Sequence, residues 1–453
     1  MNNNGITEGP IWKNMLTYFW ALLLGAFFQQ FYNTIDAVIV GRAVGSDGLG
    51  AVGGSAAMIV NVFVGFFTGL SSGATVVISQ FYGAQRKEEV SKAVHTAIAL
   101  SIAGGVLFTV VGFAATPWMI RVMSTPAEQA EAAILYLRIF FLGMTANLVY
   151  NMGAGILRAV GDSRRPLKVL VISTFANIVL DVFFVIVLGL GKKGVVQGVM
   201  GVAVATILCQ LISAVLIIRI LMRSADSYRL EPYRIGFDPS MLSRIIRIGL
   251  PAGFQSTMYT FSNVLIQSAI NSLGSDTASA WAAYGKIDVL FWMIMNSLGT
   301  VVTTFTGQNY GAGKYGRVRN CVRQGFAIAF AITVPLILFI YFGGELLLGI
   351  FIRNEVNVIR IGDQMIKFLV PFFITYIGVE VFSGTLRGMG EALIPMLITF
   401  SGICVLRVTW ILVAFPLIPS IEMVEASYPL TWITTTILYS IYYAYFIRKH
   451  NIR

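Results

Sequence analysis

The stretch FYNTIDAVIV, residues 31–40, places the carboxylate Asp36 inside an apolar run long enough to cross a lipid bilayer. A second stretch, FANIVLDVFF at residues 175–184, places Asn177 and Asp181 in a similar run. An ionisable side chain at that depth is costly, and it usually faces a bundle interior or a path for an ion, proton or substrate. The remaining chain is interpreted as a scaffold for these carboxylates.

Composition supports a membrane protein. Hydrophobic residues make up 57% of the 453 residues and charged residues only 12%, about half the charged share of a soluble domain. The net charge is +11, but Lys and Arg lie between apolar runs, which fits membrane orientation better than nucleic-acid binding. Cys209, Cys321 and Cys404 are widely spaced and show no zinc or disulfide pattern, so packing roles are expected.

Apolar runs long enough to span a bilayer predict an all-α polytopic protein with twelve transmembrane helices. Several runs exceed the length of a straight span, so tilted or projecting helices are expected. The runs are 15–40, 51–80, 93–116, 131–157, 167–190, 195–222, 243–272, 278–308, 321–342, 358–386, 393–416 and 424–447.

The distribution of Lys and Arg between the loops predicts the orientation. The richer side holds the segment 219–247 and the ends of the chain, and positive charges favour the cytoplasm. We therefore expect a multi-pass protein of the cell membrane with both termini cytoplasmic. An even number of spans agrees with that arrangement.

The longest polar stretch, residues 223–240, lies near the middle of the chain. It is interpreted as a cytoplasmic linker between two six-helix lobes, residues 1–222 and 241–453. Both lobes would insert with the same topology, as parallel repeats related by an axis along the membrane normal.

Repeated motifs support this division, because three pairs recur at an offset of 228 or 229 residues. Three matches at nearly one offset are hard to attribute to chance. The pairs are VGSD at 44–47 with LGSD at 273–276, SQFYGA at 79–84 with GQNYGA at 307–312, and LRAVGDSRRP at 157–166 with LRGMGEALIP at 386–395.

The buried polar residues are not duplicated with the scaffold. A shift of 229 residues replaces Asp36 by Leu265, Asn177 by Leu406 and Asp181 by Trp410. A passive hydrogen bond between helices would be expected in both halves, and such bonds contribute below about 1 kcal/mol on average. A special role in the first half is the simpler interpretation.

Asn177 and Asp181 lie four residues apart, so on a helix both project from one face. Their oxygens can hold a proton or coordinate a hard cation such as Na⁺, and the residues do not choose between H⁺ and Na⁺. Nearby polar residues are candidates for contact with a substrate. These are Tyr32, Asn33, Tyr150 and Asn151, with Glu380 as a further candidate in the second half.

Several segments resemble the multidrug and toxic compound extrusion (MATE) transporters over nearly the whole chain. They are TEGPIWKNML at 7–16, the first-span stretch 22–53, TTFTGQNYGAGK at 303–314 and the paired LRAVGD and LRGMGE motifs. The resemblance implies two six-helix lobes around a central cleft. It also implies alternating access, with protons or sodium ions exchanged for amphipathic, often cationic, small molecules.

The resemblance also implies an acidic site in the first lobe, of the type found in bacterial and archaeal members. Asp36 matches by its YNTID context, Asn177 and Asp181 match the NxxxD pair, and Thr206 looks like the fourth member. An apparent insertion, GKKGVVQG at 191–198, precedes Thr206. Some branches carry further acids in the second lobe, at positions that are Tyr259 and Tyr376 here.

Other function classes fit less well. A flippase for a lipid-linked precursor remains the alternative, although its cleft should be more basic than Lys286 and Arg407 alone would make it. A membrane enzyme is disfavoured, because no Asp-rich magnesium motif, catalytic His or nucleophile elbow is found. We expect no cofactor apart from the coupling ion. We also expect contacts with membrane lipids and with small amphipathic substrates. The protein is expected to be a monomer, although the sequence does not determine the oligomeric state.

Overall fold

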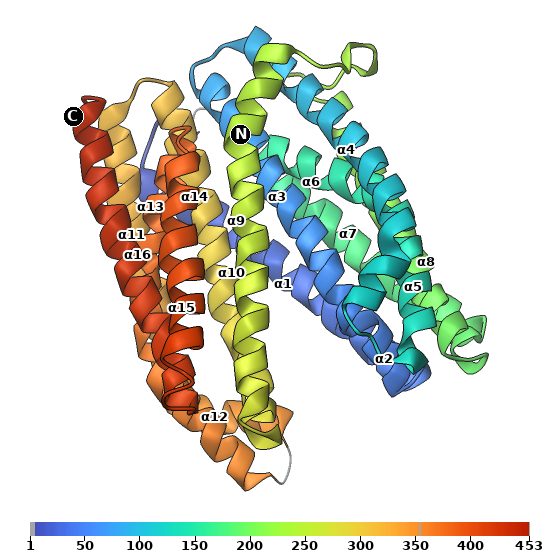
Figure 1. Ribbon diagram of the computed structural model, residues 1–453. Coiled ribbons are helices and arrows are strands. Elements are labelled where there is room, and N and C mark those ends of the chain that lie inside the picture. Colours follow the sequence, from blue (N-terminus) through green and yellow to red (C-terminus); the bar gives the residue numbers. More distant parts are fainter. Residues whose placement is uncertain (1–4, 353–354, 453) are drawn as a thin grey trace. The chain divides into compact units, whose positions relative to one another are not determined.

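The computed structural model describes residues 5–352 and 355–452, and these residues form helices and no β-strand (Figure 1). The first half contains α1 (Ile11–Ala43), α2 (Ser46–Gly53), α3 (Ser55–Gly83), α4 (Lys87–Val122), α5 (Ala127–Leu142), α6 (Met144–Ala159), α7 (Arg164–Asp181) and α8 (Val195–Met222). The second half contains α9 (Pro239–Ser272), α10 (Ser275–Gly311), α11 (Tyr315–Phe351), α12 (Val356–Leu369), α13 (Phe373–Gly388), α14 (Leu393–Thr399), α15 (Leu406–Val413) and α16 (Ile421–Lys449).

The helices match the expected apolar runs. Within the described ranges, nine helical spans are long and apolar enough to cross a membrane, or ten with the bent pair α5 and α6. Two further long helices, α9 and α16, cover the expected runs at 243–272 and 424–447. Since α10 and α11 each have 37 residues, they exceed the ~20 that a straight span needs. The prediction of an all-α polytopic membrane protein is confirmed.

Two interruptions shape the first half. The axes of α5 and α6 differ by 51° at Gly143. A Cβ at that residue would lie 2.7 Å from Gln210 Oε1 and 2.8 Å from Ile207 Cγ1, so only glycine fits between the helices without a shift. Further along, α7 ends at Asp181 and continues as one π-helical turn, Val182–Val187. Such turns are rare and are frequent at functional sites.

The sequence repeat is visible in helix positions and packing. The helices α12, α13 and α14 begin 229 residues after α5, α6 and α7. In the first half α6 packs against α3, α4 and α8, and in the second half α13 packs against α10, α11 and α16. Corresponding helices therefore have corresponding neighbours, which confirms that the halves share one fold.

The LRAVGD and LRGMGE motifs end their helices in the same way. Gly161 and Gly390 both have positive φ, 94° and 92°, a conformation that glycine adopts without strain. Gly161 donates its N–H to the Arg158 carbonyl at 3.0 Å, and Gly390 donates to the Arg387 carbonyl at 2.8 Å. The motif therefore encodes a helix C-terminus, which explains why it is retained in both halves.

The chain divides into two compact units, residues 20–253 and residues 1–19 with 254–453. The division falls inside α1 and α9, whereas the sequence places the boundary in the linker. Part of the reason is that the start of the chain is bonded to the second half. Lys314 Nζ donates to the Thr7 carbonyl at 3.0 Å, and Arg317 donates to the Ile6 and Gly9 carbonyls at 3.1 Å each.

The first part of α9 belongs to the same unit as α3 because the two helices pack closely. A Cβ on Gly73 or Gly249 would meet backbone atoms of the opposite helix, and a Cβ on Gly253 would lie 2.6 Å from the Phe66 carbonyl oxygen. Such contacts bring two helix backbones together as only small residues permit. The Arg244 guanidinium also lies over the Phe81 ring, 5.3 Å from its centroid.

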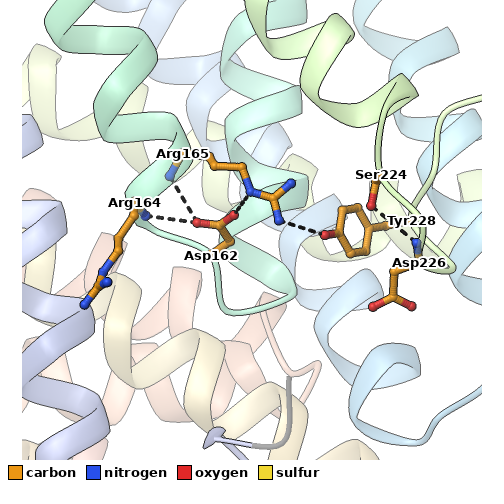
Figure 2. A network of polar contacts seen from close by, with 6 residues as sticks. All are labelled: Asp162, Arg164, Arg165, Ser224, Asp226 and Tyr228. Atoms are coloured by element: carbon orange, nitrogen blue, oxygen red, sulfur yellow. Dashed lines mark hydrogen bonds and ion pairs between the residues drawn. The ribbon is translucent and has the colours of Figure 1, made fainter. Parts of the chain in front are cut away.

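The linker, residues 223–240, is bonded to the first half rather than free (Figure 2). Arg165 forms an ion pair with Asp162 and donates from Nη2 to the Tyr228 hydroxyl at 3.2 Å. Tyr82 donates its hydroxyl to Asp226 Oδ2 at 2.9 Å. The turn between α6 and α7 and the end of α3 thereby hold the linker in place.

Candidate functional site

A cavity of about 420 Å³ lies within the first half. Side chains from α1, α3, α5, α6, α7 and α8 line it. Apolar side chains such as Val60, Val64 and Leu170 alternate with polar ones such as Asn61 and Asn147. Polar side chains predominate in this wall, and such groups can fix the orientation of a bound small molecule.

Asp36 forms part of the cavity wall, and Asp181 lies behind it. The Asp36 side chain is 9% exposed, and Asp181 and Asn177 have no exposed surface. The two carboxyl groups lie within electrostatic reach of one another, although they come from α1 and α7. The structure thus brings together the two acidic residues that the sequence singled out.

These side chains hold buried polar atoms without a well-formed hydrogen bond. In the part of the chain that the structure describes, no partner is found for Asp36 Oδ1, for either Asp181 carboxylate oxygen or for the Asn177 side-chain oxygen and nitrogen. Unpaired buried polar groups are rare in proteins and need an explanation such as a bound ion. A proton or Na⁺ held among these oxygens would satisfy them.

Thr206 and Tyr32 belong to the same site. Thr206 is 6% exposed and lines the cavity from α8. Tyr32 donates its hydroxyl to Thr206 Oγ1 at 3.4 Å. Since Tyr32 lies one turn before Asp36 on α1, its phenol stands within electrostatic reach of that carboxylate. All four residues predicted for the ion site therefore lie in one region of the first half.

Two residues that the sequence did not indicate belong to this region. Tyr136 of α5 lines the cavity and is within electrostatic reach of Asp36 and Asp181. Cys209 of α8 lines the cavity beside Asn177. Both residues occur in apolar helical stretches where a Tyr or Cys usually packs in a core, so only the fold reveals their surroundings.

Four of the five residues predicted to contact substrate line the cavity. These are Tyr32, Asn33, Tyr150 and Asn151. The amide of Asn151 donates to the Asn147 backbone oxygen at 2.9 Å and to its side-chain oxygen at 3.0 Å, which orients both side chains.

Glu380 is not among the residues that line this cavity, and it lies on α13 in the other compact unit. Its side chain lies over Gly299 of α10, where a Cβ would overlap Glu380 Oε1. Tyr259 and Tyr376, the positions at which some branches carry acids, lie next to one another and within electrostatic reach of Glu380.

The described residues contain no group of three or more His, Cys, Asp or Glu side chains placed to hold a metal ion together. Tightly bound transition metals usually need three or four such ligands. The carboxylates and hydroxyls of the first half are instead of the kind that protons and hard monovalent cations use.

Comparisons with known proteins agree with the fold. The MatE family model matches residues 21–183 and 251–412, one segment in each half. The probable multidrug resistance protein YoeA of Bacillus subtilis is 27% identical over 459 aligned residues, which cover 98% of this chain and 96% of YoeA. The probable multidrug resistance protein NorM of Thermotoga maritima is 27% identical over 345 residues, covering 74% of this chain and 72% of NorM.

Solved structures superpose over nearly the full length. A MOP superfamily transporter from Pyrococcus furiosus has a TM-score of 0.90 at 24% identity, covering 99% of this chain and 98% of that one. A MATE structure in complex with MaL6 has a TM-score of 0.90 at 22% identity, covering 99% of each chain. With both halves matched by the family model, the chain belongs to the MatE family of multidrug efflux transporters, which are multi-pass membrane proteins and not enzymes.

Proposed function

We propose that this protein is a secondary active antiporter that exports amphipathic, often cationic, small molecules in exchange for protons or sodium ions. Alternating access would expose the site to each side of the membrane in turn. The observation that carries this proposal is the buried pair Asp36 and Asp181, whose carboxyl groups lie within reach of a shared proton or cation. Asp36 Oδ1 and both Asp181 oxygens find no other donor among the described residues.

The pair explains how an ion could drive a change of conformation. Two ionised carboxylates repel one another strongly where water is excluded. One proton or one Na⁺ between Asp36 and Asp181 would relieve that repulsion and draw α1 and α7 together. Since α7 changes to a π-helical turn directly after Asp181, the helix has a local irregularity that can absorb such a movement.

The cavity chemistry suits amphipathic substrates. Aromatic side chains from α1, α5 and α6, namely Tyr32, Tyr136, Phe140 and Tyr150, contribute to its wall. Aromatic faces attract cations and apolar groups alike. The described lining contains one carboxylate, Asp36, and no Lys or Arg. A flippase for a diphosphate-linked lipid would need basic groups there, so the cavity favours export of cationic or neutral compounds.

We further propose the membrane arrangement. The segments 1–222 and 241–453 act as the two lobes, and the linker 223–240 lies in the cytoplasm of a protein that works as a monomer in the cell membrane. The bias of Lys and Arg supports this orientation. Residues 1–4 and 453, the ends of the chain, lie outside the described residues.

The test is movement of a fluorescent cationic dye across proteoliposome membranes under an imposed sodium gradient or an imposed pH gradient. Wild type should move dye under one of the gradients, and that gradient names the coupling ion. Asp36→Asn should remove the response, because the amide cannot exchange a proton or neutralise Na⁺.

A matched control is Asp288→Asn in the second half, where the carboxylate accepts a hydrogen bond from Trp292 Nε1 at 2.7 Å. The same change of charge there should leave gradient-driven transport in place. Folded wild-type protein that moves no dye under either gradient would refute the antiporter and favour a lipid-linked substrate.

A further inference from the structure

A second cavity, of about 460 Å³, opens at the start of α11 in the second half. Its described lining holds four cationic side chains and no acidic one. The lining residues are Lys314, Gly316, Arg317, Arg319, Asn320 and Arg323. Convergence of four positive charges without a counter-charge is unfavourable unless the charges meet an anion.

Two of the cations have partners in the protein and two do not. Lys314 and Arg317 bind carbonyl oxygens of residues 6–9, and Arg317 also donates to Asn309 Oδ1 at 3.1 Å. Arg319 and Arg323 are exposed, and no ion pair or hydrogen bond of their side chains is found within the described ranges. Their guanidinium groups remain available to an incoming anion.

The corresponding surface of the first half is used differently. In this part of the repeat the offset is 228 residues, so Arg319 corresponds to Ser91 and Arg323 to His95 on α4. There His95 Nε2 accepts the N–H of Glu231 at 3.0 Å, and Thr96 Oγ1 accepts the N–H of Asp238 at 3.1 Å. The linker thus lines one side of a cavity of about 560 Å³ at the start of α4. That cavity has mixed charge, with Glu88 and Asp238 beside Lys92 and Arg234, whereas the charged side chains that line the equivalent cavity on α11 are all cationic.

The difference between the two halves indicates that the cavity on α11 is more than a result of the general excess of positive charge on one side of the membrane. Positive-inside bias accounts for an excess of Lys and Arg near one membrane surface. It does not explain why four cations line one concavity in the second half, where the first half offers Ser91 and His95 at the matching positions. A specific anion is a more complete explanation.

The surface next to the cavity is apolar and aromatic. Phe326, one turn after Arg323, packs against Phe330 with ring centroids 6.3 Å apart and against Phe382 at 5.1 Å. Phe382 in turn packs against Tyr443 at 5.1 Å. Tyr443 lies within electrostatic reach of Arg319 and Arg323, and Phe330 is 41% exposed. A basic pocket therefore borders a partly exposed aromatic strip.

We infer that Arg319 and Arg323 bind the phosphate of an anionic phospholipid headgroup, with acyl chains lying along the strip of Phe326, Phe330 and Tyr443. Guanidinium groups bind phosphate oxygens in bidentate fashion. Basic pockets at the ends of transmembrane helices are suited to anionic headgroups. This inference concerns a different half from the transport cavity and does not depend on the coupling ion.

The test compares lipid binding by purified full-length protein in a mild detergent. Phosphatidylglycerol and phosphatidylcholine are titrated separately, and bound lipid is counted by native mass spectrometry. Wild type should bind phosphatidylglycerol in preference. Arg319→Gln combined with Arg323→Gln should weaken that binding on the order of tenfold or more, because each cation near an anionic surface contributes about fivefold.

The matched control is Arg86→Gln combined with Lys87→Gln, which removes the same charge at the start of α4, where Arg86 faces Glu89 at 4.0 Å. This pair should bind phosphatidylglycerol as wild type does. Equal weakening in both double variants would overturn the inference in favour of general charge attraction. If the double variant of Arg319 and Arg323 does not fold, Arg323→Gln alone should still weaken phosphatidylglycerol binding severalfold. Wild-type affinity of that single variant would overturn the inference.

A last arm distinguishes the source of the phosphate. Inorganic phosphate and glycerol phosphate are added as competitors at concentrations equal to that of the lipid. Weak competition is expected, because neither compound contacts the aromatic strip. Displacement of the lipid by equimolar soluble phosphate would overturn the lipid assignment and indicate a site for a soluble anion.

Discussion

The cavity wall of the first half and the matching positions of the second half lie on corresponding helices but differ in chemistry. Among the four ion-site residues, only Thr206 keeps its type, as Thr435. The other three ion-site residues are replaced by Leu265, Leu406 and Trp410, and Tyr32, Tyr136 and Cys209 are replaced by Phe261, Met365 and Leu438. Other cavity positions stay polar, since Asn33, Asn147 and Asn151 correspond to Ser262, Tyr376 and Glu380.

Two residues of the second half at ion-site positions form hydrogen bonds within that half. Trp410, at the position of Asp181, donates its indole N–H to the Met423 carbonyl at 2.8 Å and packs on a core of Ile266, Ile270 and Val424. Thr435 donates to the Thr431 carbonyl at 2.6 Å. Both halves thus keep the residues that helix packing requires. Among the described residues, buried carboxylate oxygens without a well-formed hydrogen bond are found in the first half, at Asp36 and Asp181. That difference is the structural argument for an ion site.

The largest effect is expected from Asp181→Asn. Gradient-driven dye transport should fall more than about a hundredfold, since the amide can neither release a proton nor balance a cation. Reconstituted transport, normalised to folded protein, measures the change. Asp36→Asn should have the same effect. Near-normal transport by both variants would show that the two carboxylates only hold helices together.

Trp292→Phe should affect stability rather than transport. The change removes the indole donor of Asp288 Oδ2 and leaves the weaker contact of Tyr284 OH with Oδ1 at 3.5 Å. We expect the free energy of unfolding to fall by about 1–3 kcal/mol, measured by unfolding in detergent. Transport per folded molecule should persist, so loss of transport at normal stability would place ion coupling in the second half as well.

Tyr32→Phe should have an intermediate effect on transport. The variant loses the hydroxyl that bonds to Thr206 Oγ1 but keeps the aromatic ring in the cavity wall. Loss of one such hydrogen bond corresponds to about a fivefold reduction, measured as the initial rate of dye movement. Tyr445→Phe, at an exposed position of α16, is the control. Equal reductions in both variants would show that the Tyr32 hydroxyl has no specific role in the site.

Glu380→Gln should have the smallest effect. Its carboxyl group lies over Gly299 and does not line the cavity of the first half, so transport should stay within about threefold of wild type, less than the loss of one average hydrogen bond would cause. The same dye assay measures it. Complete loss would show that the comparison between the halves assigns coupling to the wrong one.

Much of the fold could be predicted because its signals are local. Apolar length places the spans, and glycines such as Gly161 and Gly390 end equivalent helices wherever their motif recurs. The sequence missed Tyr136 and Cys209, since a Tyr or Cys in an apolar helix has no local sign of what it faces. It also missed the division of α1 and α9 between the compact units, which depends on packing such as Gly249 against α3.

By itself, the sequence determined the helical membrane architecture, the internal repeat and the confinement of Asp36 and Asp181 to one half, because hydrophobic length, motif spacing and residue type are all properties of the chain alone. Only the tertiary structure decided that these carboxylates from α1 and α7 meet beside one cavity, that Glu380 lies over Gly299 in the other compact unit, and that Arg319 and Arg323 open into a basic pocket whose counterpart on α4 has mixed charge. The physical reason is that side chains distant in sequence interact only once helix packing sets their separation.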